Sequence, residues 1–296
     1  MKPTTFLSLR RVAKKLSFWG HIPIAQKILR RIFYGAQGTV HIHDFDGDLT
    51  IELRLSEHMQ SRIFWIGYYS REVIAVIDRL ARKDMIFIDV GANIGEITMV
   101  AAKRVTPSGQ VISFEPADRH AELLERNVLE NNLSNVTVVR CGLSDYEGTA
   151  QMYDSCGQGV SNDEHLGLSS VYRGTGLGPP IQSVTLTTLD GFLDLHPLSR
   201  VDIIKIDIEG AELPCLRGAE RTLRRFAPHL IVEIQRTSAV AAGYKQSDIL
   251  DFLSQFGYTF FSIGHGGKLR PVDATNLGDY QNVLCVPSNA FGSSRA

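Results

Sequence analysis

From residue 85 onward, two patterns of apolar residues alternate along the chain. Short continuous apolar runs, typical of buried strands, are followed by segments whose apolar positions lie three and four residues apart, as in helices. The predicted strands are Met85–Val90, Val111–Phe114, Val136–Val139, Val184–Thr187, Val201–Ile208, Leu230–Ile234, Tyr258–Ile263 and Val283–Val286. The predicted helices are Ile94–Arg104, Arg119–Asn131, Glu212–Phe226 and Asp248–Phe256. This alternation predicts an α/β fold with a mostly parallel sheet and helices on both faces.

Two stretches depart from this alternation. Before residue 85, the pattern predicts two strands, Val40–His43 and Leu49–Leu55, joined by an Asp-Gly turn, and a helix at Glu72–Leu80. Residues 154–180 are rich in Gly and Ser and weakly periodic, and a loop of this length is usually either functional or mobile. We therefore predict three parts: a basic amphipathic leader (1–38), strands and a helix packing on the core (39–84), and the main domain (85–290).

The formal net charge of −1 conceals an asymmetry. Residues 1–43 contain eight Lys or Arg and no Asp or Glu, which leaves 23 basic against 32 acidic residues elsewhere. Apolar residues interleave with the leader's charges, so it either packs on the domain or contacts an anionic membrane surface. The acidic remainder disfavours a nucleic-acid partner.

Targeting and redox signals place the chain in the cytoplasm. The sequence has no long uncharged apolar run, so neither a signal peptide nor a membrane-spanning helix is expected. The four cysteines are scattered without zinc-binding spacing, as in a protein with reduced thiols. We predict a cytoplasmic protein, with contact to the inner face of the membrane through residues 1–38 as the alternative.

Acidic residues stand at the ends of the predicted strands. They are Asp89, Glu115, Asp207, Glu209 and Glu233. Ligands of parallel α/β sheets bind beyond the carboxyl ends of the strands, so all five are candidates for one site. A single such acid could simply cap the next helix, but five along one edge favour a ligand.

The turn after the first of these strands discriminates between nucleotide ligands. Asp89-Val90-Gly91-Ala92-Asn93-Ile94-Gly95 lacks the Gly-x-Gly-x-x-Gly pattern of dinucleotide sites. Asp89 would repel a pyrophosphate and favour an ammonium or sulfonium. Glu115 follows 26 residues later, where an acid can accept hydrogen bonds from ribose hydroxyls. S-adenosyl-L-methionine (SAM) carries all three groups, which disfavours a NAD-dependent oxidoreductase.

Two separated motifs now resemble one family. The turn Asp89–Gly95 and the segment Lys205-Ile206-Asp207-Ile208-Glu209-Gly210-Ala211-Glu212 are similar to signatures of the FkbM family of class I SAM-dependent methyltransferases. Phe114-Glu115-Pro116 and Thr188-Leu189-Asp190 also fit, and the resemblance covers about residues 65–287. It implies a Rossmann-like, seven-stranded, mostly parallel sheet with an antiparallel last strand, and methyl transfer to a hydroxyl.

The resemblance also implies roles for individual residues. The expected cofactor-binding residues are Asp89, Gly91, Asn93, Gly95, Glu115, Pro116, Gly142 and Leu143. Either Ser144 or Asp145 would meet the adenine amine. The family often has a Tyr-Glu pair upstream of the first strand, where this chain has Tyr69-Ser70, which makes Tyr69 a weaker candidate.

The catalytic candidates are Asp207 and Glu209, since an acceptor hydroxyl must lose its proton to a base. Glu233 is expected to face the acceptor, while Glu212 is expected in a first helical turn, where an acid is stabilised without any catalytic role. We assign no metal, although the acidic cluster could instead hold Mg²⁺. His265 is expected on an exposed loop. Residues 154–180 are the predicted lid over a small-molecule or glycan acceptor, and a non-catalytic SAM-binding protein is the alternative function.

Overall fold

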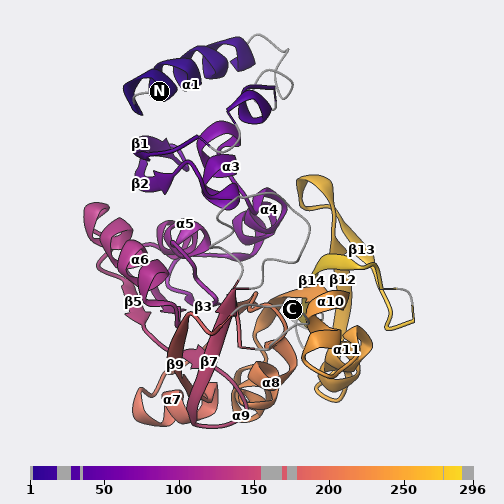
Figure 1. Ribbon diagram of the computed structural model, residues 1–296. Helices are drawn as coiled ribbons and strands as arrows, with labels where there is room; N and C mark the ends of the chain where they lie inside the picture. Colours follow the sequence, from indigo (N-terminus) through magenta and orange to yellow (C-terminus); the bar gives the residue numbers. More distant parts are fainter. Residues whose placement is uncertain are drawn as a thin grey trace.

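The computed structural model describes residues 3–18, 28–33, 36–154, 169–171, 179–275 and 277–288. Its centre is an eight-stranded sheet in the order β13-β12-β14-β11-β10-β3-β4-β5 (Figure 1). These strands are β3 (Ile86–Val90), β4 (Gln110–Phe114), β5 (Val136–Val139), β10 (Ile203–Ile206), β11 (His229–Gln235), β12 (Tyr258–Ile263), β13 (Leu269–Pro271) and β14 (Tyr280–Pro287).

Strands β11, β10, β3, β4 and β5 are parallel, and β14 is antiparallel to both of its neighbours. The predicted α/β class and the antiparallel last strand are therefore confirmed. The strand number differs, because a short hairpin adds β13 to the outer edge of β12. The predicted Val201–Ile208 strand is shorter than expected, since the chain leaves the sheet after Ile206.

Alternate side chains of the central strands enter two separate cores. Phe87, Val111 and Ile203 pack on one face, and Ile88, Ile112 and Ile204 on the other. The first core is covered by α3 (His58–Ile66), α4 (Arg71–Leu80), α5 (Glu96–Val105) and α6 (Asp118–Glu130). The second is covered by α7 (Leu189–Leu195), α8 (Glu212–Arg217), α9 (Glu220–Phe226) and α11 (Gln246–Ser254). Burial on both faces explains why these strands read as continuous apolar runs.

One predicted helix is divided in the structure. Glu212–Phe226 forms α8 and α9, with the break at Gly218. A Cβ at Gly218 would lie 1.9 Å from the carbonyl oxygen of Ser144, so only glycine allows the two backbones to approach this closely. The break thereby holds the segment after β6 (Gly142–Leu143) against the main domain.

A second sheet lies beside the main one, in the order β6-β9-β7-β8. It contains β7 (Gly148–Asp154), β8 (Ser169–Ser170) and β9 (Gln182–Thr187) in addition to β6. The predicted Val184–Thr187 strand belongs to it, whereas β7 was not predicted because its sequence, Gly-Thr-Ala-Gln-Met-Tyr-Asp, has little apolar periodicity. Most of residues 154–180 lies outside the described residues.

The N-terminal part stacks on the first core (Figure 1). β1 (Thr39–Phe45) and β2 (Leu49–Arg54) form the predicted hairpin, and α1 (Pro3–Phe18) packs against it. Phe6, Arg10 and Ala13 are the buried face of α1, and the Arg10 Nε donates to the carbonyl of Phe64 at 2.6 Å. This contact supports the packing alternative for the described part of the leader.

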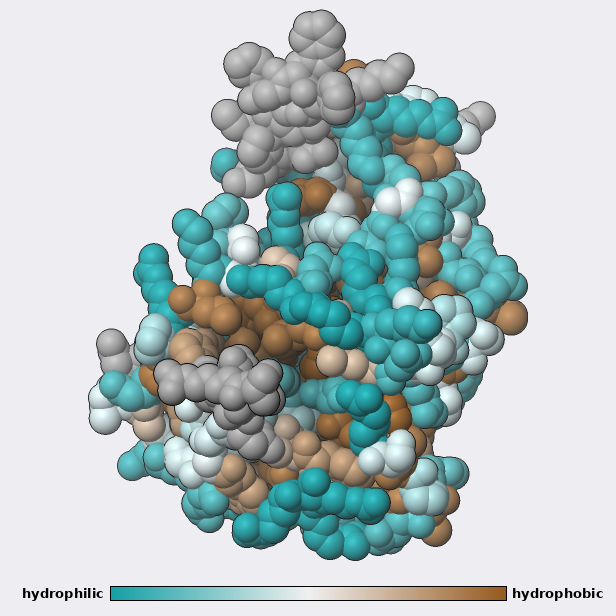
Figure 2. Space-filling model, turned by 180° about the vertical axis from the view of Figure 1, so that it is seen from behind, coloured by the Kyte–Doolittle hydropathy of each residue, from teal (hydrophilic) through white to brown (hydrophobic). Residues whose placement is uncertain are grey.

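Membrane contact by the leader stays a prediction. No helix in the described ranges is long and apolar enough to cross a bilayer. Figure 2 shows hydrophilic side chains around the described part of the leader, while the apolar side chains of that face gather at mid-height. The three-part division of the chain likewise stays a prediction.

Candidate functional site

A pocket opens at the carboxyl ends of β3, β4, β10 and β11, where the sequence predicted a site. One wall, which we call the turn side, comprises the turn after β3 and the residues following β4 and β5: Gly91, Asn93, Glu115, Pro116, Gly142 and Leu143. The other wall, the acid side, comprises Tyr69, Asp207, Glu209 and Glu233. Eight of the ten predicted cofactor and catalytic residues therefore line one pocket.

The turn after β3 uses its amides internally. Gly91 and Ala92 donate to the carbonyl of Phe114, both at 3.0 Å. Asn93 donates to Glu115 at 2.7 Å, and Ile94 donates to the side chain of Asn93 at 2.8 Å. No amide from Gly91 to Gly95 is left to bind a phosphate, since Gly95 donates to Ala92. This geometry disfavours the dinucleotide alternative on grounds independent of the missing glycine.

The Glu115 carboxylate is buried at the base of the turn side. One oxygen accepts from Asn93 and the other from the amide of Ala117 at 2.9 Å. Burial raises its pKa to about 7, in spite of these two hydrogen bonds. Each oxygen keeps a lone pair, so the carboxylate is both fixed in place and able to accept from two vicinal hydroxyls.

Gly91 sets the distance between the two walls. Its φ is +76°, and a Cβ would lie 2.0 Å from the carbonyl oxygen of Asp207. A side chain here would therefore separate the turn from the segment after β10. The conformation that places Gly91 in the pocket also places Asp207 opposite it.

The far end of the turn side is largely apolar. Pro116, Leu143, Met152 and Leu186 line it, together with the polar residue Ser144. Asp145 does not line the pocket, so Ser144 is the better candidate to meet an adenine amine. A flat aromatic base would fit this wall with few polar contacts, as is usual for small-molecule sites.

Two predicted cofactor residues lie behind the pocket. Gly95 precedes α5 and packs on Leu124. Asp89 is fully buried, accepts a hydrogen bond from Thr98 at 2.7 Å and lies 3.3 Å from the Lys205 ammonium. The expectation that Asp89 meets the ligand's cation directly is corrected, because Lys205 is the cation it faces.

Lys205 joins the two motifs of the sequence. Its ammonium donates to the carbonyl of Gly91 at 2.8 Å and lies between Asp89 and Asp207, 3.8 Å from the latter. Burial disfavours the charged form, but the neighbouring acids outweigh burial and raise the pKa of Lys205. Lys205 therefore stays charged and fixes the turn relative to the acid side.

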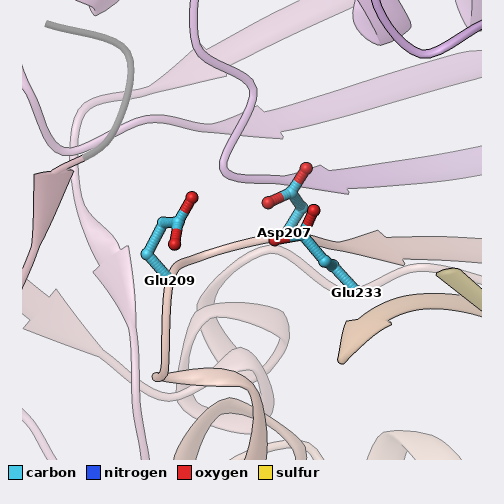
Figure 3. A group of neighbouring side chains, drawn as sticks. All are labelled: Asp207, Glu209 and Glu233. Carbon is cyan, nitrogen blue, oxygen red and sulfur yellow. The ribbon is translucent and has the colours of Figure 1, made fainter. Parts of the chain in front are cut away.

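Three carboxylates converge on the acid side (Figure 3). Asp207 and Glu209 follow β10, Glu233 lies in β11, and one oxygen of each lies within 4.8 Å of the others. Burial and then the charge of Asp207 raise the pKa of Glu209 to about 8 and that of Glu233 well above its ordinary value. Such a group holds protons near neutral pH or a cation, so it can serve proton transfer or Mg²⁺ binding.

Glu209 has an unusual backbone. Its φ is +51°, in the left-handed region that non-glycine residues rarely adopt. Ser170 donates to its carbonyl at 2.7 Å and Ser238 to its carboxylate at 3.2 Å. Glu212 accepts from the amides of Ile208 and Gly210, which stabilises the same turn. Glu212 thus stabilises the turn and does not line the pocket. This position agrees with the expectation of an acid in a first helical turn without a catalytic role.

Comparison with known proteins assigns the family. The model of the methyltransferase FkbM domain matches residues 89–260, more than half of the chain. The chain belongs to the FkbM methyltransferase family. It is 30% identical to Methyltransferase 1 of Beauveria bassiana over 51% of this chain and 65% of the relative. It is 27% identical to the 2-O-methyltransferase NoeI of Sinorhizobium fredii over 51% of this chain and 63% of that one.

A solved FkbM methyltransferase from Methylobacillus flagellatus is similar, with 19% identity and a TM-score of 0.43 over 69% of this chain and 43% of that one. The chain spans less than two thirds of the length of the two curated relatives. The family match confirms the predicted family, and the topology of the main sheet confirms the predicted fold class.

Among the pocket residues of this FkbM methyltransferase that the sequence did not predict, or predicted only weakly, four have side chains that can carry a charge or donate a hydrogen bond close to the predicted residues. They are Tyr69, Glu96, His120 and Lys205. Glu96 accepts from the amides of Tyr69 at 2.6 Å and Ser70 at 3.1 Å, and burial raises its pKa to about 7. A Glu at the start of a helix carries no sequence signal of a partner 27 positions away, so only the fold reveals this contact.

The predicted lid reaches the pocket in its described part. Ser170 contacts Glu209, and Val171 lines the pocket beside Met152. The other lid candidates, from Asp163 to His165, and Tyr172 and Arg173 lie outside the described residues. His265 is 96% exposed, as expected for a loop residue, and lies 3.8 Å from Glu72.

Proposed function

We propose that this FkbM methyltransferase is a SAM-dependent O-methyltransferase. Its acceptor would be a hydroxyl of a small molecule, a sugar or a glycan such as a glycolipid or polysaccharide precursor. The observation that carries the proposal is the pairing of a fixed, buried Glu115 on one wall with three acids on the opposite wall. The name of NoeI, a 2-O-methyltransferase, supports a hydroxyl acceptor.

The residues present fit SAM. Glu115 would accept from the ribose hydroxyls, Asn93 and Gly91 would line the methionine part, and Ser144 would face the adenine. The ligand's sulfonium, which S-adenosylhomocysteine lacks, would lie toward the acid side, where Asp207 is 34% exposed. When bound, SAM supplies an electrophilic methyl group on a positive sulfur.

The acids then act on the acceptor. An alcohol is a weak nucleophile until its proton is removed. Asp207 or Glu209 would accept that proton, which leaves the oxygen free to take the methyl group that SAM would supply. The products are a methyl ether, S-adenosylhomocysteine and a protonated carboxyl. Lys205 contacts both Asp207 and the carbonyl of Gly91, so Asp207 would keep a fixed position relative to the donor side of the pocket.

A binding measurement comes first in the test. Calorimetry with SAM and S-adenosylhomocysteine is expected to show one site per chain. Incubation with methyl-labelled SAM and fractionated cell glycolipids, followed by mass spectrometry, is expected to give a labelled methyl ether. The control is Asp207→Asn, which should bind S-adenosylhomocysteine without labelling any fraction. Failure to bind either compound contradicts the proposal, and labelling of added RNA instead of glycolipid would overturn the acceptor class.

A further inference from the structure

Two arginines extend the acid side of the pocket outward. Arg62 lies on α3, one turn after His58 and Met59, which line the pocket. Its guanidinium carbon lies 5.4 Å from the ring centroid of Tyr69, another lining residue. Arg62 therefore continues the pocket wall that α3 begins.

Arg30 lies beside Arg62. Residues 28–32 are helical, and Phe33 stacks on Trp65 of α3 with 5.9 Å between ring centroids. Arg30 and Arg62 each precede these rings by three residues, so they share the contacting faces of their helices. The charge of Arg62, after burial, lowers the pKa of Arg30, which is consistent with two guanidinium groups at close range.

Within the part of the chain that the structure describes, neither arginine has an acidic partner. Two other arginines of this region do have acidic partners: Arg10 with Asp44 at 2.7 Å, and Arg104 with Asp46 and with Asp78 at 2.7 Å. The ion pairs of the described residues include neither Arg30 nor Arg62, and the buried Nε of each has no hydrogen-bond partner. Two adjacent buried donors without partners are costly unless an anion satisfies them.

Tyr69 connects the arginines with the acids. The guanidinium group of Arg62 lies over its ring. Burial, and then the charges of Asp207 and Glu233, raise the pKa of the Tyr69 hydroxyl. A molecule lying along Tyr69 would thus have one end at the carboxylates and the other at the guanidinium groups.

We propose that Arg30 and Arg62 form a subsite for a carboxylate or phosphate group of the acceptor, whose reacting hydroxyl lies at Asp207 and Glu209. The inference rests on the proposed function and narrows the acceptor to an anionic sugar or polyol. Guanidinium groups bind both anions through paired N–H donors, so the same subsite serves either group.

The test compares three probes on the full chain saturated with S-adenosylhomocysteine: inorganic phosphate, D-glucuronate and D-glucose. Calorimetry is expected to show saturable binding of at least one anion and none of glucose. Arg62→Gln and Arg30→Gln should each weaken that anion at least about tenfold, because a charge-assisted bond is lost. Arg62→Lys keeps the charge without the paired donors, so its affinity for the anion should lie between those of the wild type and Arg62→Gln.

The matched control is Arg11→Gln, an exposed arginine of the same N-terminal part. It should leave anion binding unchanged, which excludes an effect of net charge. Which anion binds more tightly distinguishes a uronic acid from a sugar phosphate. Equal anion binding in the wild type and in Arg62→Gln, or binding of neither anion, overturns the subsite. S-adenosylhomocysteine binding in the same samples reports separately on the proposed function.

Discussion

The two walls of the pocket are built in different ways. The turn side is formed mainly by the segments that follow three consecutive parallel strands, β3, β4 and β5, and its amides and its one carboxylate are hydrogen-bonded to each other. The acid side collects side chains from the segment after β10, from β11 and from the segment before α4, and its carboxylates repel one another. A wall whose polar groups are already hydrogen-bonded can bind a ligand without a change in its own structure or protonation. A wall of like charges can instead take up protons or cations. The comparison predicts that donor binding and chemistry can be separated by mutation.

The largest separation is expected from Asp207→Asn. Removing the carboxylate should lower kcat by about 10²–10⁴-fold, the usual contribution of a general base. Affinity for S-adenosylhomocysteine should change little, since Asp207 lies on the opposite wall from Glu115. Steady-state kinetics and calorimetry on the same preparation measure both. Near-normal turnover in Asp207→Asn would mean that Glu209 or Glu233, and not Asp207, is the base.

The reverse separation is expected from Glu115→Ala. Loss of two hydrogen bonds to a charged group should weaken SAM binding by about 10–100-fold. At saturating SAM, kcat should fall much less, because the acid side is unaltered. Glu122→Ala, an exposed acid on the neighbouring α6, is the control and should bind SAM normally. An unchanged dissociation constant in Glu115→Ala would remove Glu115 from the cofactor site.

These two positions also differ in how far the sequence revealed them. Glu115 was predicted from a local rule, an acid after the second strand of a β-α-β unit, and the structure places it in the pocket. Asp89 fitted the same rule, yet it contacts Lys205, because a buried lysine on the adjacent strand is invisible to reading along one strand. Tyr69 and Glu96 meet only through tertiary packing. Strand and helix positions followed from periodicity, while β7 and the division at Gly218 depended on contacts between distant segments.

The acid side should give a pH dependence that the turn side does not. A base works when deprotonated, and the pKa of Glu209 is raised to about 8 by burial and Asp207. If Glu209 is the base, kcat should rise with pH and level off above about 8, and the residual rate of Glu209→Gln should be flat. If kcat of Glu209→Gln still rises with pH, the titrating base is another group. Chelation followed by Mg²⁺ addition should leave the profile unchanged unless the acids hold a metal.

The smallest effect is expected outside the pocket. Arg10→Met removes the bonds to Phe64 and Asp44 beneath α1 and should reduce the free energy of unfolding by about 1–3 kcal/mol. Arg11→Met, on the exposed face of the same helix, should change it by less than about 0.5 kcal/mol. Urea titration compares them. Equal losses would mean that the leader is held by something other than its buried face.

The left-handed backbone of Glu209 has a consequence for how the protein tolerates change. A glycine there would relieve a conformational penalty of about 1–2 kcal/mol while deleting a carboxylate from the pocket. Random mutagenesis screened only for survival on heating would therefore favour Glu209→Gly, and a screen for methylation would eliminate it. Position 209 is thus a place where durability and activity select for different amino acids.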